Sequence, residues 1–330
     1  MASALLALDW GTSSLRAYLL TAGSDDRPQV GETRNAPWGI MSLPSGGYPA
    51  ALSQLCGDWL EGHPDIPLLA SGMVGSAQGW VEAPYVPCPA GAAQLAAGLA
   101  SVPLHQVPGQ ASRSLLIVPG VLQAGELPNV MRGEETQVIG AVGLTGGGEE
   151  RLMVLPGTHS KWVVVRESTI QRFSTFMTGE LYAALRAHTI LGRLMSAEAK
   201  ADASERAFRR GLDVALQGGT GGLPATLFSV RTLGLTRQLN PEELPDYLSG
   251  LLIGAELAGA LDAFGTGVRA RPLTLIGDAR LCTRYQDALA YAGFGSSRTL
   301  AGATEAGLWQ IGRAAKLIVA PDPSEPEVAP

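Results

Sequence analysis

The stretch "LALDWGTSSLRAYLL", residues 6–20, decides the fold that we expect of this 330-residue chain. An apolar run ends at Asp9, the small-residue turn "GTSS" follows, and a second apolar run begins at Leu15. Two strand-like runs around such a turn predict a β-hairpin with Asp9 near the end of its first strand. Asp9 can act there as a local cap that accepts turn N–H groups, or it can have a functional role, and these residues alone leave both open.

The composition is typical of a globular protein with a large core. Hydrophobic residues make up 46% and charged residues 16%, and the length allows two domains. A net charge of -6 and a pI of about 5.3 argue against nucleic-acid binding, which needs a basic face, and favour a small-molecule ligand. Three scattered cysteines suggest neither disulfides nor a metal site. With no signal peptide or membrane span recognised, we expect a cytoplasmic protein without a membrane partner.

The order of apolar patterns predicts an α/β protein in two parts. Strand-like runs recur at Ser114–Gly120, Arg151–Gly157 and Pro272–Asp278. Helical patterns such as residues 247–264 lie between them. The glycine-rich segment 143–151 is the expected crossing. We therefore expect an N-terminal domain over 1–145, a C-terminal domain over 146–318 and a disordered tail over 319–330.

An internal repeat supports this division. The turn of residues 11–14 has the pattern G-T-x-S, and residues 157–160 repeat it inside a second pair of apolar runs. Each copy therefore predicts a hairpin that opens one half of the molecule. Two such turns facing each other across a cleft would present backbone N–H groups and hydroxyls to a polyphosphate.

The phosphate hypothesis gives Asp9 a function. A carboxylate beside phosphates repels them unless it holds Mg²⁺, usually through water, between itself and the phosphate oxygens. In the second copy Pro156 replaces the acid, and proline also removes an N–H group. Asp9 is therefore the one Mg²⁺-directed carboxylate expected from the two hairpins.

Several motifs resemble those of a known family. "LDWGTSSLRAYLL" resembles the first phosphate motif of the sugar kinase, actin and Hsp70 superfamily, "LPGTHSKWVVV" the second, and "LTLIGDARLCTRYQDALAYAGF" the adenosine motif. Together with "SGMVGSAQGW", "NVMRGEETQVIGA", "FMTGEL" and "LSGLLIGAE", they resemble the 2-dehydro-3-deoxygalactonokinase family from about Ala4 to Ala315.

This resemblance implies a fold and an activity. The fold would be two ribonuclease-H-like (actin-like ATPase) domains with an interdomain cleft. The activity would be Mg²⁺-dependent phosphoryl transfer from ATP to the 6-hydroxyl of 2-dehydro-3-deoxy-D-galactonate in galactonate catabolism. Two alternatives stay open: a kinase of another keto-deoxy acid, such as the gluconate epimer, and a nucleotide switch that binds no sugar. A homo-oligomer is also left open.

The resemblance and the patterns together assign candidate site residues. Glu135 is the expected catalytic base, with Glu134 in reserve, although acids at a helix start also compensate the helix dipole. Arg16 is expected to hold the transferring phosphoryl group or the substrate carboxylate, or to form a hairpin salt bridge. Contacts to ATP are expected from Gly11, Thr12, Ser13, Ser14, Gly157, Thr158, His159, Ser160, Gly277 and Asp278. For His159 a role that only fills the loop is an equal alternative.

The substrate is itself an anion and needs a basic partner. Arg132 ranks first for this contact, although it could equally be an ordinary surface arginine, and Lys161 is a further candidate. Glu180 could accept hydrogen bonds from sugar hydroxyls, but it could equally be an ordinary acid at a helix N-terminus. Asp278 has a similar ambiguity, because it could cap a helix rather than border the adenine.

Overall fold

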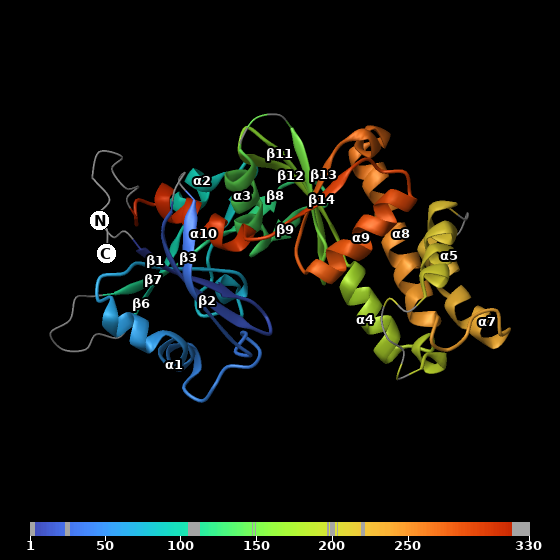
Figure 1. Cartoon of the computed structure of the whole chain (residues 1–330), viewed down its shortest axis with the longest axis horizontal. Coiled ribbons are helices and arrows are strands. Elements are labelled where there is room, and N and C mark those ends of the chain that lie inside the picture. The colour runs from blue at the N-terminus through green and yellow to red at the C-terminus, as the bar shows by residue number, and fades with distance from the viewer. Residues whose placement is uncertain are drawn as a thin grey trace. The chain divides into compact units, whose positions relative to one another are not determined.

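The structure, a computed structural model, describes residues 4–23, 27–104, 113–146, 148, 150–196, 198, 202, 204–218 and 222–318 (Figure 1). The chain divides into two compact units. Unit 1 comprises Met1–Glu150, Val165–Arg172 and Gly302–Pro330, and unit 2 comprises Arg151–Val164 and Phe173–Ala301. The tail expected over 319–330 lies outside the described residues.

Unit 1 is built on a six-stranded sheet. The predicted hairpin forms its centre, because strand β1 pairs antiparallel with β2, which pairs with β3, while β4 and then β7 join in parallel. The order across the sheet is β3-β2-β1-β4-β7-β6. The bounds are β1 (Ala4–Trp10), β2 (Leu15–Ala22), β3 (Pro28–Ala36), β4 (Leu68–Ser71), β6 (Ala100–Pro103) and β7 (Ser114–Ile117).

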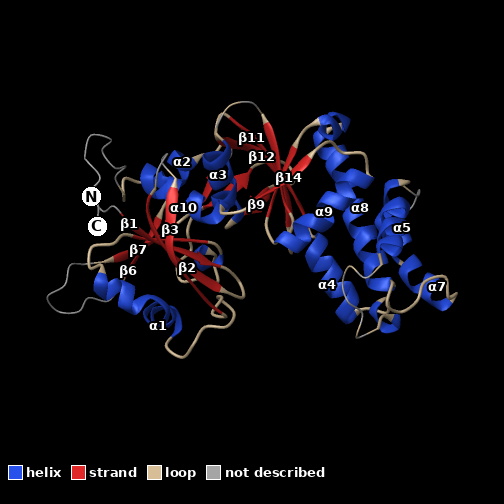
Figure 2. Ribbon diagram, in the orientation of Figure 1, coloured by secondary structure: helices blue, strands red, loops and turns tan. Residues whose placement is uncertain are grey.

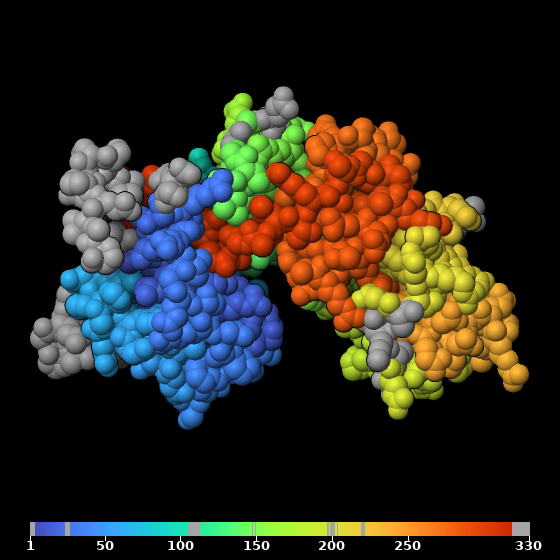
Figure 3. Space-filling view, viewed as in Figure 1, coloured from blue at the N-terminus to red at the C-terminus, as the bar shows by residue number. Residues whose placement is uncertain are grey.

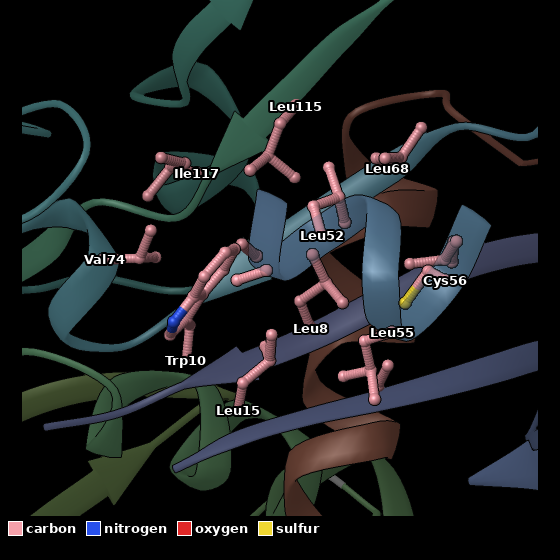
Figure 4. Close-up of a cluster of buried hydrophobic side chains, with 14 of the residues drawn as sticks. Leu8, Trp10, Leu15, Leu52, Leu55, Cys56, Leu68, Val74, Leu115 and Ile117 are labelled. Atoms are coloured by element: carbon pink, nitrogen blue, oxygen red, sulfur yellow. The ribbon is translucent and has the colours of Figure 1, made fainter. Parts of the chain in front are cut away.

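The core of unit 1 forms where helix α1 (Gly47–Gly62) covers this sheet. Ala51, Leu52, Leu55, Cys56 and Trp59 recur at helical spacing, so one face of α1 is apolar and buried. These side chains meet residues of β1, β2, β4 and β7, as Figure 4 shows around Leu8, Trp10, Leu15, Leu68, Leu115 and Ile117. Blue atoms of the segment that contains β1 to β3 and α1 make up much of the face of unit 1 seen in Figure 3.

The rest of unit 1 includes a small second sheet and three further helices. The sheet has the order β5-β8-β9, with β5 (Tyr85–Pro87), β8 (Gly120–Gln123) and β9 (Asn129–Met131). The helices are α2 (Ala92–Ala97), α3 (Glu134–Thr145) and α10 (Ala303–Ala314). Helices α3 and α10 pack backbone to backbone, since a Cβ at Gly140 would lie 1.8 Å from the Ala303 carbonyl oxygen.

Unit 2 combines a five-stranded sheet with a helical part (Figure 2). The sheet order is β12-β11-β10-β13-β14, with β10 (Arg151–Leu155), β11 (Ser160–Arg166), β12 (Thr169–Phe176), β13 (Leu273–Ile276) and β14 (Ser297–Leu300). Two strands of this sheet, β11 and β12, run partly through the Val165–Arg172 segment that belongs to unit 1. The helices are α4 (Thr178–His188), α5 (Glu205–Leu216), α6 (Gly222–Leu227), α7 (Ser229–Leu235), α8 (Leu244–Phe264) and α9 (Ala279–Tyr291).

Helix α8 is the central helix of unit 2. Among the described residues it alone is long and apolar enough to span a membrane by length and composition, with 56% of its most apolar window buried. Leu251 and Leu252 of α8 contribute to one hydrophobic cluster, and Ile253 and Leu257 contribute to another. A helix between two apolar clusters is expected to be apolar on most of its circumference, so its composition is explained by the core.

The two larger sheets share one strand order. The first three strands of each sheet lie side by side in reverse chain order, and two later strands continue the sheet beyond the first strand. The orders are β3-β2-β1-β4-β7 and β12-β11-β10-β13-β14. The repeat of G-T-x-S in the sequence thus marks the same hairpin in both sheets.

The two units differ from the expected domain boundaries. The first boundary falls after Glu150 rather than after residue 145, and residues 165–172 and 302–318, expected in the second domain, belong to unit 1. For residues 302–318 the reason is the apolar face of α10, on which Leu308 and Ile311 are fully buried, together with glycines that let α10 approach α3 closely.

Candidate active site

The first phosphate turn joins β1 to β2 in unit 1. The Gly11 N–H donates to the Ser14 carbonyl at 3.0 Å, which closes the turn. A segment after β3 fixes the backbone of the turn from outside: Gly39 lies so close that a Cβ there would be 2.2 Å from the Thr12 carbonyl oxygen. The side chains of Thr12 and Ser13 are exposed, so they are accessible to a ligand.

Asp9 lies directly opposite Arg16 in this hairpin, and their side chains form an ion pair with Oδ2 and Nη1 3.8 Å apart. In the part of the chain that the structure describes, Asp9 accepts no hydrogen bond from the turn, so the local-cap alternative is not observed. Burial raises the pKa of Asp9. The positive charge of Arg16 lowers this pKa, and the negative charge of Glu305 on α10 raises it further. The ion pair is the alternative role considered for Arg16, yet its side chain stays 54% exposed.

The donor chemistry at Asp9 fits a magnesium ion. Mg²⁺ in kinases is held by one or two carboxylates, waters and substrate phosphates rather than by an all-protein cage. The Asp9 side chain is 26% exposed, so an ion with its waters can reach it. Among the described residues no three His, Cys, Asp or Glu side chains gather as a metal cluster.

Backbone contacts bring Asp9 and the start of α3 to neighbouring positions. A Cβ at Gly72, which follows β4, would lie 2.8 Å from the Trp10 carbonyl oxygen. A Cβ at Gly133, the residue before α3, would lie 3.3 Å from the Gly72 Cα. Both glycines have positive φ, 97° and 107°, which side chains disfavour. Gly72 is therefore the bridge between the end of β1 and the acidic start of α3.

Glu135 is buried in the first turn of α3, with no exposed surface. The Gly133 N–H donates to both its carboxylate oxygens, at 2.9 and 2.7 Å, and the Thr136 hydroxyl donates at 3.1 Å. Burial, followed by the charge of Glu134, raises the pKa of Glu135 to about 7. A carboxylate with a pKa near neutrality, positioned by fixed donors, has the property required of a general base.

Arg132 precedes this acidic pair and has a partly unpaired guanidinium group. Nη2 donates to the Ala83 carbonyl at 2.8 Å, and the guanidinium carbon lies 4.4 Å from the centre of the Tyr85 ring. Nε and Nη1 are buried without a hydrogen-bond partner. Unpaired buried donors of a charged group are costly, so an acceptor that reached them would bind strongly.

The second phosphate turn, in unit 2, has its own supports. The N-terminus of α4 lies against it, since a Cβ at Gly179 would be 2.4 Å from the Gly157 carbonyl oxygen. The Glu180 N–H donates to the Thr158 carbonyl at 3.0 Å, and the Glu180 carboxylate is hydrogen-bonded to Nε2 of His159. Glu180 thus stands in the first turn of a helix, which is the alternative considered for it, and it holds the turn.

Two residues expected to contact ligands point into the protein instead. Lys161 is 3% exposed, and its Nζ donates to the His159 carbonyl at 2.9 Å. Ser160 has no exposed surface, and its hydroxyl contacts Tyr285 at 2.9 Å. As successive residues at the start of β11 they point to opposite faces of the sheet, and both faces are buried there. The two side chains therefore support the turn from within the protein, and we no longer expect Lys161 to bind the substrate.

A pocket of about 480 Å³ opens beside this turn within unit 2. Its lining includes Gly157, Thr158 and Gly179 on one side and Asp278, Leu281 and Arg284 of the α9 segment on another. Asp278 caps α9, accepting from the Leu281 N–H at 3.0 Å, so the capping alternative holds while the residue also lines the pocket. Gly277 has φ 149°, and a Cβ there would lie 3.3 Å from the Pro156 carbonyl oxygen.

The sequence analysis did not identify the buried carboxylate of Glu256 on α8. It also did not identify Gly39 and Gly179, the glycines that pack against the two phosphate turns. A lone acid within the uncharged run from Leu248 to Leu261 was the available signal for Glu256. Its partners are 29 to 94 residues away, so the pattern could not name them. The glycines gave no local signal, because each is required by a segment distant in sequence.

Comparison with known proteins decides the family. A model of the 2-keto-3-deoxy-galactonokinase family matches residues 9–311. The chain belongs to this family. The resemblance expected from the motifs is therefore confirmed, and the matched residues span every segment of the site described above.

Individual relatives of the 2-keto-3-deoxy-galactonokinase family agree. A 2-dehydro-3-deoxygalactonokinase from Escherichia coli is 36% identical over 87% of this chain and 90% of its own. A crystal structure from Sinorhizobium meliloti, described provisionally as the same kinase, has a TM-score of 0.79 and 35% identity over 94% of this chain and 98% of its own. Component A of an Acidaminococcus fermentans (R)-2-hydroxyglutaryl-CoA dehydratase, at 11% identity over 95% of this chain and 100% of its own, shares the fold with a TM-score of 0.51. The predicted fold class, two actin-like halves, is confirmed.

Proposed function

We propose that this protein transfers a phosphoryl group from ATP to the 6-hydroxyl of 2-dehydro-3-deoxy-D-galactonate, with Mg²⁺ as cofactor. Family membership supports the substrate. The observation that carries the chemistry is the buried Glu135 carboxylate, with a pKa of about 7, three residues after an arginine with unpaired guanidinium N–H groups. A base and an anion-binding group then lie on one short segment.

Glu135 is the general base in this proposal. Phosphoryl transfer depends on alignment and charge neutralisation, and the protein must also accept the proton of the attacking hydroxyl. The Gly133 N–H and Thr136 hydroxyl hold the carboxylate in one orientation. A base with a pKa near the working pH combines a useful ionised fraction with adequate basicity.

The two arginines and Asp9 neutralise or organise negative charge. Arg132 receives the substrate carboxylate, since its Nε and Nη1 lack acceptors in the described structure. Asp9 holds Mg²⁺, and the half-exposed Arg16 beside it neutralises the phosphoryl group in transfer. Because Arg16 and Asp9 are directly opposite across the hairpin, their relative position is set by strand register.

Unit 2 provides the nucleotide pocket. Bound ATP supplies the phosphoryl group. The Gly157–Thr158 backbone is suited to the phosphates, and the glycine–helix junction at Gly277 and Asp278 is suited to the flat base, which needs close approach to the backbone. The cleft expected between the two halves stays a prediction.

A coupled ADP-release assay against a panel of sugar acids tests this function. We expect a high kcat/KM for 2-dehydro-3-deoxy-D-galactonate and little ADP release without a sugar acid. A preference for the gluconate epimer would keep the chemistry and correct the substrate. Slow ADP release that ignores every sugar acid would indicate a nucleotide switch and refute the proposal.

A further inference from the structure

The Glu256 carboxylate lies at the centre of a hydrogen-bond network beneath the nucleotide pocket. Its residue is 2% exposed, in the middle of α8. Trp162 Nε1 donates to Oε1 at 2.8 Å, and the Tyr285 hydroxyl donates to Oε2 at 2.6 Å, as does the Thr178 hydroxyl. The donors come from β11, α9 and α4, so this one carboxylate connects three elements to α8.

The network continues to the second phosphate turn. The Tyr285 oxygen lies 2.9 Å from the Ser160 hydroxyl, and the Ser160 oxygen accepts the Gly157 N–H at 3.4 Å. Thr178, Tyr285 and Gly157 also line the pocket. A path of four hydrogen-bonded residues therefore leads from Glu256 to the backbone of the turn.

The chemistry of the partners gives this path a direction. The indole of Trp162 can only donate, and Tyr285 has a single proton, which it donates to Glu256. Ser160 must then donate its own proton to Tyr285, which leaves the Ser160 oxygen as an acceptor for Gly157. Burial raises the pKa of Glu256, and the hydrogen bonds from Thr178, Tyr285 and Trp162 oppose this by favouring the charged form. The geometry matches the ionised carboxylate, because a protonated Oε2 would have to donate to Thr178 or Tyr285 and reverse this order.

We propose that Glu256 is a positioning residue for the second phosphate turn, acting through Tyr285 and Ser160. It directs both hydroxyl protons away from the turn, so that Ser160 holds the Gly157 N–H and the turn is shaped before nucleotide binds. Ser160 then serves the turn as an acceptor and donates no hydrogen bond to phosphate. The proposal rests on the proposed function, since it assumes that nucleotide binds at this turn.

Glu256→Gln is the decisive substitution because it keeps the shape of the side chain and reverses the polarity. The new amide group faces Thr178 and Tyr285 with N–H donors, so both hydroxyls must turn around. Tyr285 then donates to Ser160, and the displaced Ser160 proton competes with the Gly157 N–H. We expect the ADP Kd, measured by calorimetry, and the KM for ATP to rise about tenfold, on the scale of one lost hydrogen bond, with the KM for the sugar acid unchanged.

A double-mutant cycle with Ser160→Ala separates this role from a general loss of packing. If Glu256 acts through Ser160, then Glu256→Gln weakens ADP binding less than about twofold in the Ser160→Ala background, because the group it controls is absent. An equal, additive loss in both backgrounds would overturn the proposal. Glu243→Gln, at the start of the same helix, is the matched control, since Glu243 accepts hydrogen bonds from Asn240 and Arg206 but does not line the pocket. It should leave the ADP Kd unchanged.

A second variant covers the case in which Glu256→Gln does not fold. Tyr285→Phe cuts the path while leaving Glu256 bonded to Trp162 and Thr178, and we expect the same weakening and the same non-additivity with Ser160→Ala. Additive effects there would also refute the positioning role. Wild-type protein that bound no ADP would instead refute the proposed function, and the positioning role with it, so the two failures are distinguishable.

Discussion

Glu135→Gln should make the protein less active and, at alkaline pH, more stable. The substitution keeps the shape of the side chain and removes its charge. If Glu135 is the base, kcat falls roughly 10²–10⁴-fold while ATP binding is retained. If the acid only compensates the helix dipole, turnover stays nearly intact and the variant is destabilised by up to about 1 kcal/mol.

The stability change can be worked out from the structure. Burial raises the pKa of Glu135 from 4.5 to about 7, so the folded state binds this proton more tightly than the unfolded state. The free energy of unfolding therefore falls as pH rises from 4.5 to 7, by about 3 kcal/mol for a shift of this size. The Glu135→Gln variant does not undergo this pH-dependent fall in the free energy of unfolding. Its amide weakens the hydrogen bonds from Gly133 and Thr136, which lowers the free energy of unfolding by about 1 kcal/mol at every pH.

The expected result is a change of sign with pH. At pH 4.5 the glutamine variant should be about 1 kcal/mol less stable than wild type, and at pH 8 about 2 kcal/mol more stable. Urea unfolding at both pH values, with kcat measured on the same preparations, gives the comparison. Wild-type kcat/KM should rise with pH up to about 7, as the base ionises.

Glu134→Gln is the matched control for this test. Glu134 accepts the Arg132 N–H at 3.1 Å, and its charge helps to raise the pKa of Glu135. The control should therefore retain turnover and move the acid limb of the pH–rate profile to lower pH. An active Glu135→Gln enzyme would mean that the base is another residue. Equal destabilisation at both pH values would refute the burial argument.

Three further substitutions test other parts of the site. Asp9→Asn should lower kcat roughly 10²–10³-fold at saturating Mg²⁺, the scale of one preorganised charge contact, and wild-type turnover would exclude the metal role. Arg132→Met should raise the KM for the sugar acid about 10²-fold through loss of a charge-assisted contact, whereas an equal rise in the KM for ATP would contradict a substrate-specific role. Gly39→Ala should weaken ATP binding in calorimetry, because its Cβ would lie 2.2 Å from the Thr12 carbonyl oxygen. Gly57→Ala, whose nearest contact would be 3.7 Å away, is the control, and equal ATP affinity in both variants would show that the contact is unimportant.

Much of the architecture was predictable because it rests on local patterns. The G-T-x-S turns, the apolar runs around them and the acid at the end of β1 are each contained in about fifteen residues, and the paired register of Asp9 and Arg16 follows from the turn. The acidic start of α3 was likewise visible in the sequence.

What escaped prediction depends on contacts between distant segments. The direction of Ser160 is set by Tyr285, 125 residues later, so an apparently exposed turn hydroxyl is in fact buried. Lys161 was assigned to the substrate on charge alone, because alternation of side chains at the start of β11 could not show which face is covered. The packing of α10 on α3 depends on glycines in both helices, and such pairs leave no periodic signal.

Gly39 and Gly179, which pack against the two phosphate turns, determine where this chain can tolerate a change in length. Gly39 comes three residues after the end of β3, and Gly179 comes three residues after the end of β12. Two residues separate the strand from the glycine in each case, and the two pairs, Pro37-Trp38 and Met177-Thr178, share no residue type. The duplication is thus preserved here as a spacing rather than as a sequence. A single residue inserted into either spacer would move the glycine off its turn, whereas an insertion in a surface loop elsewhere would leave both turns in place.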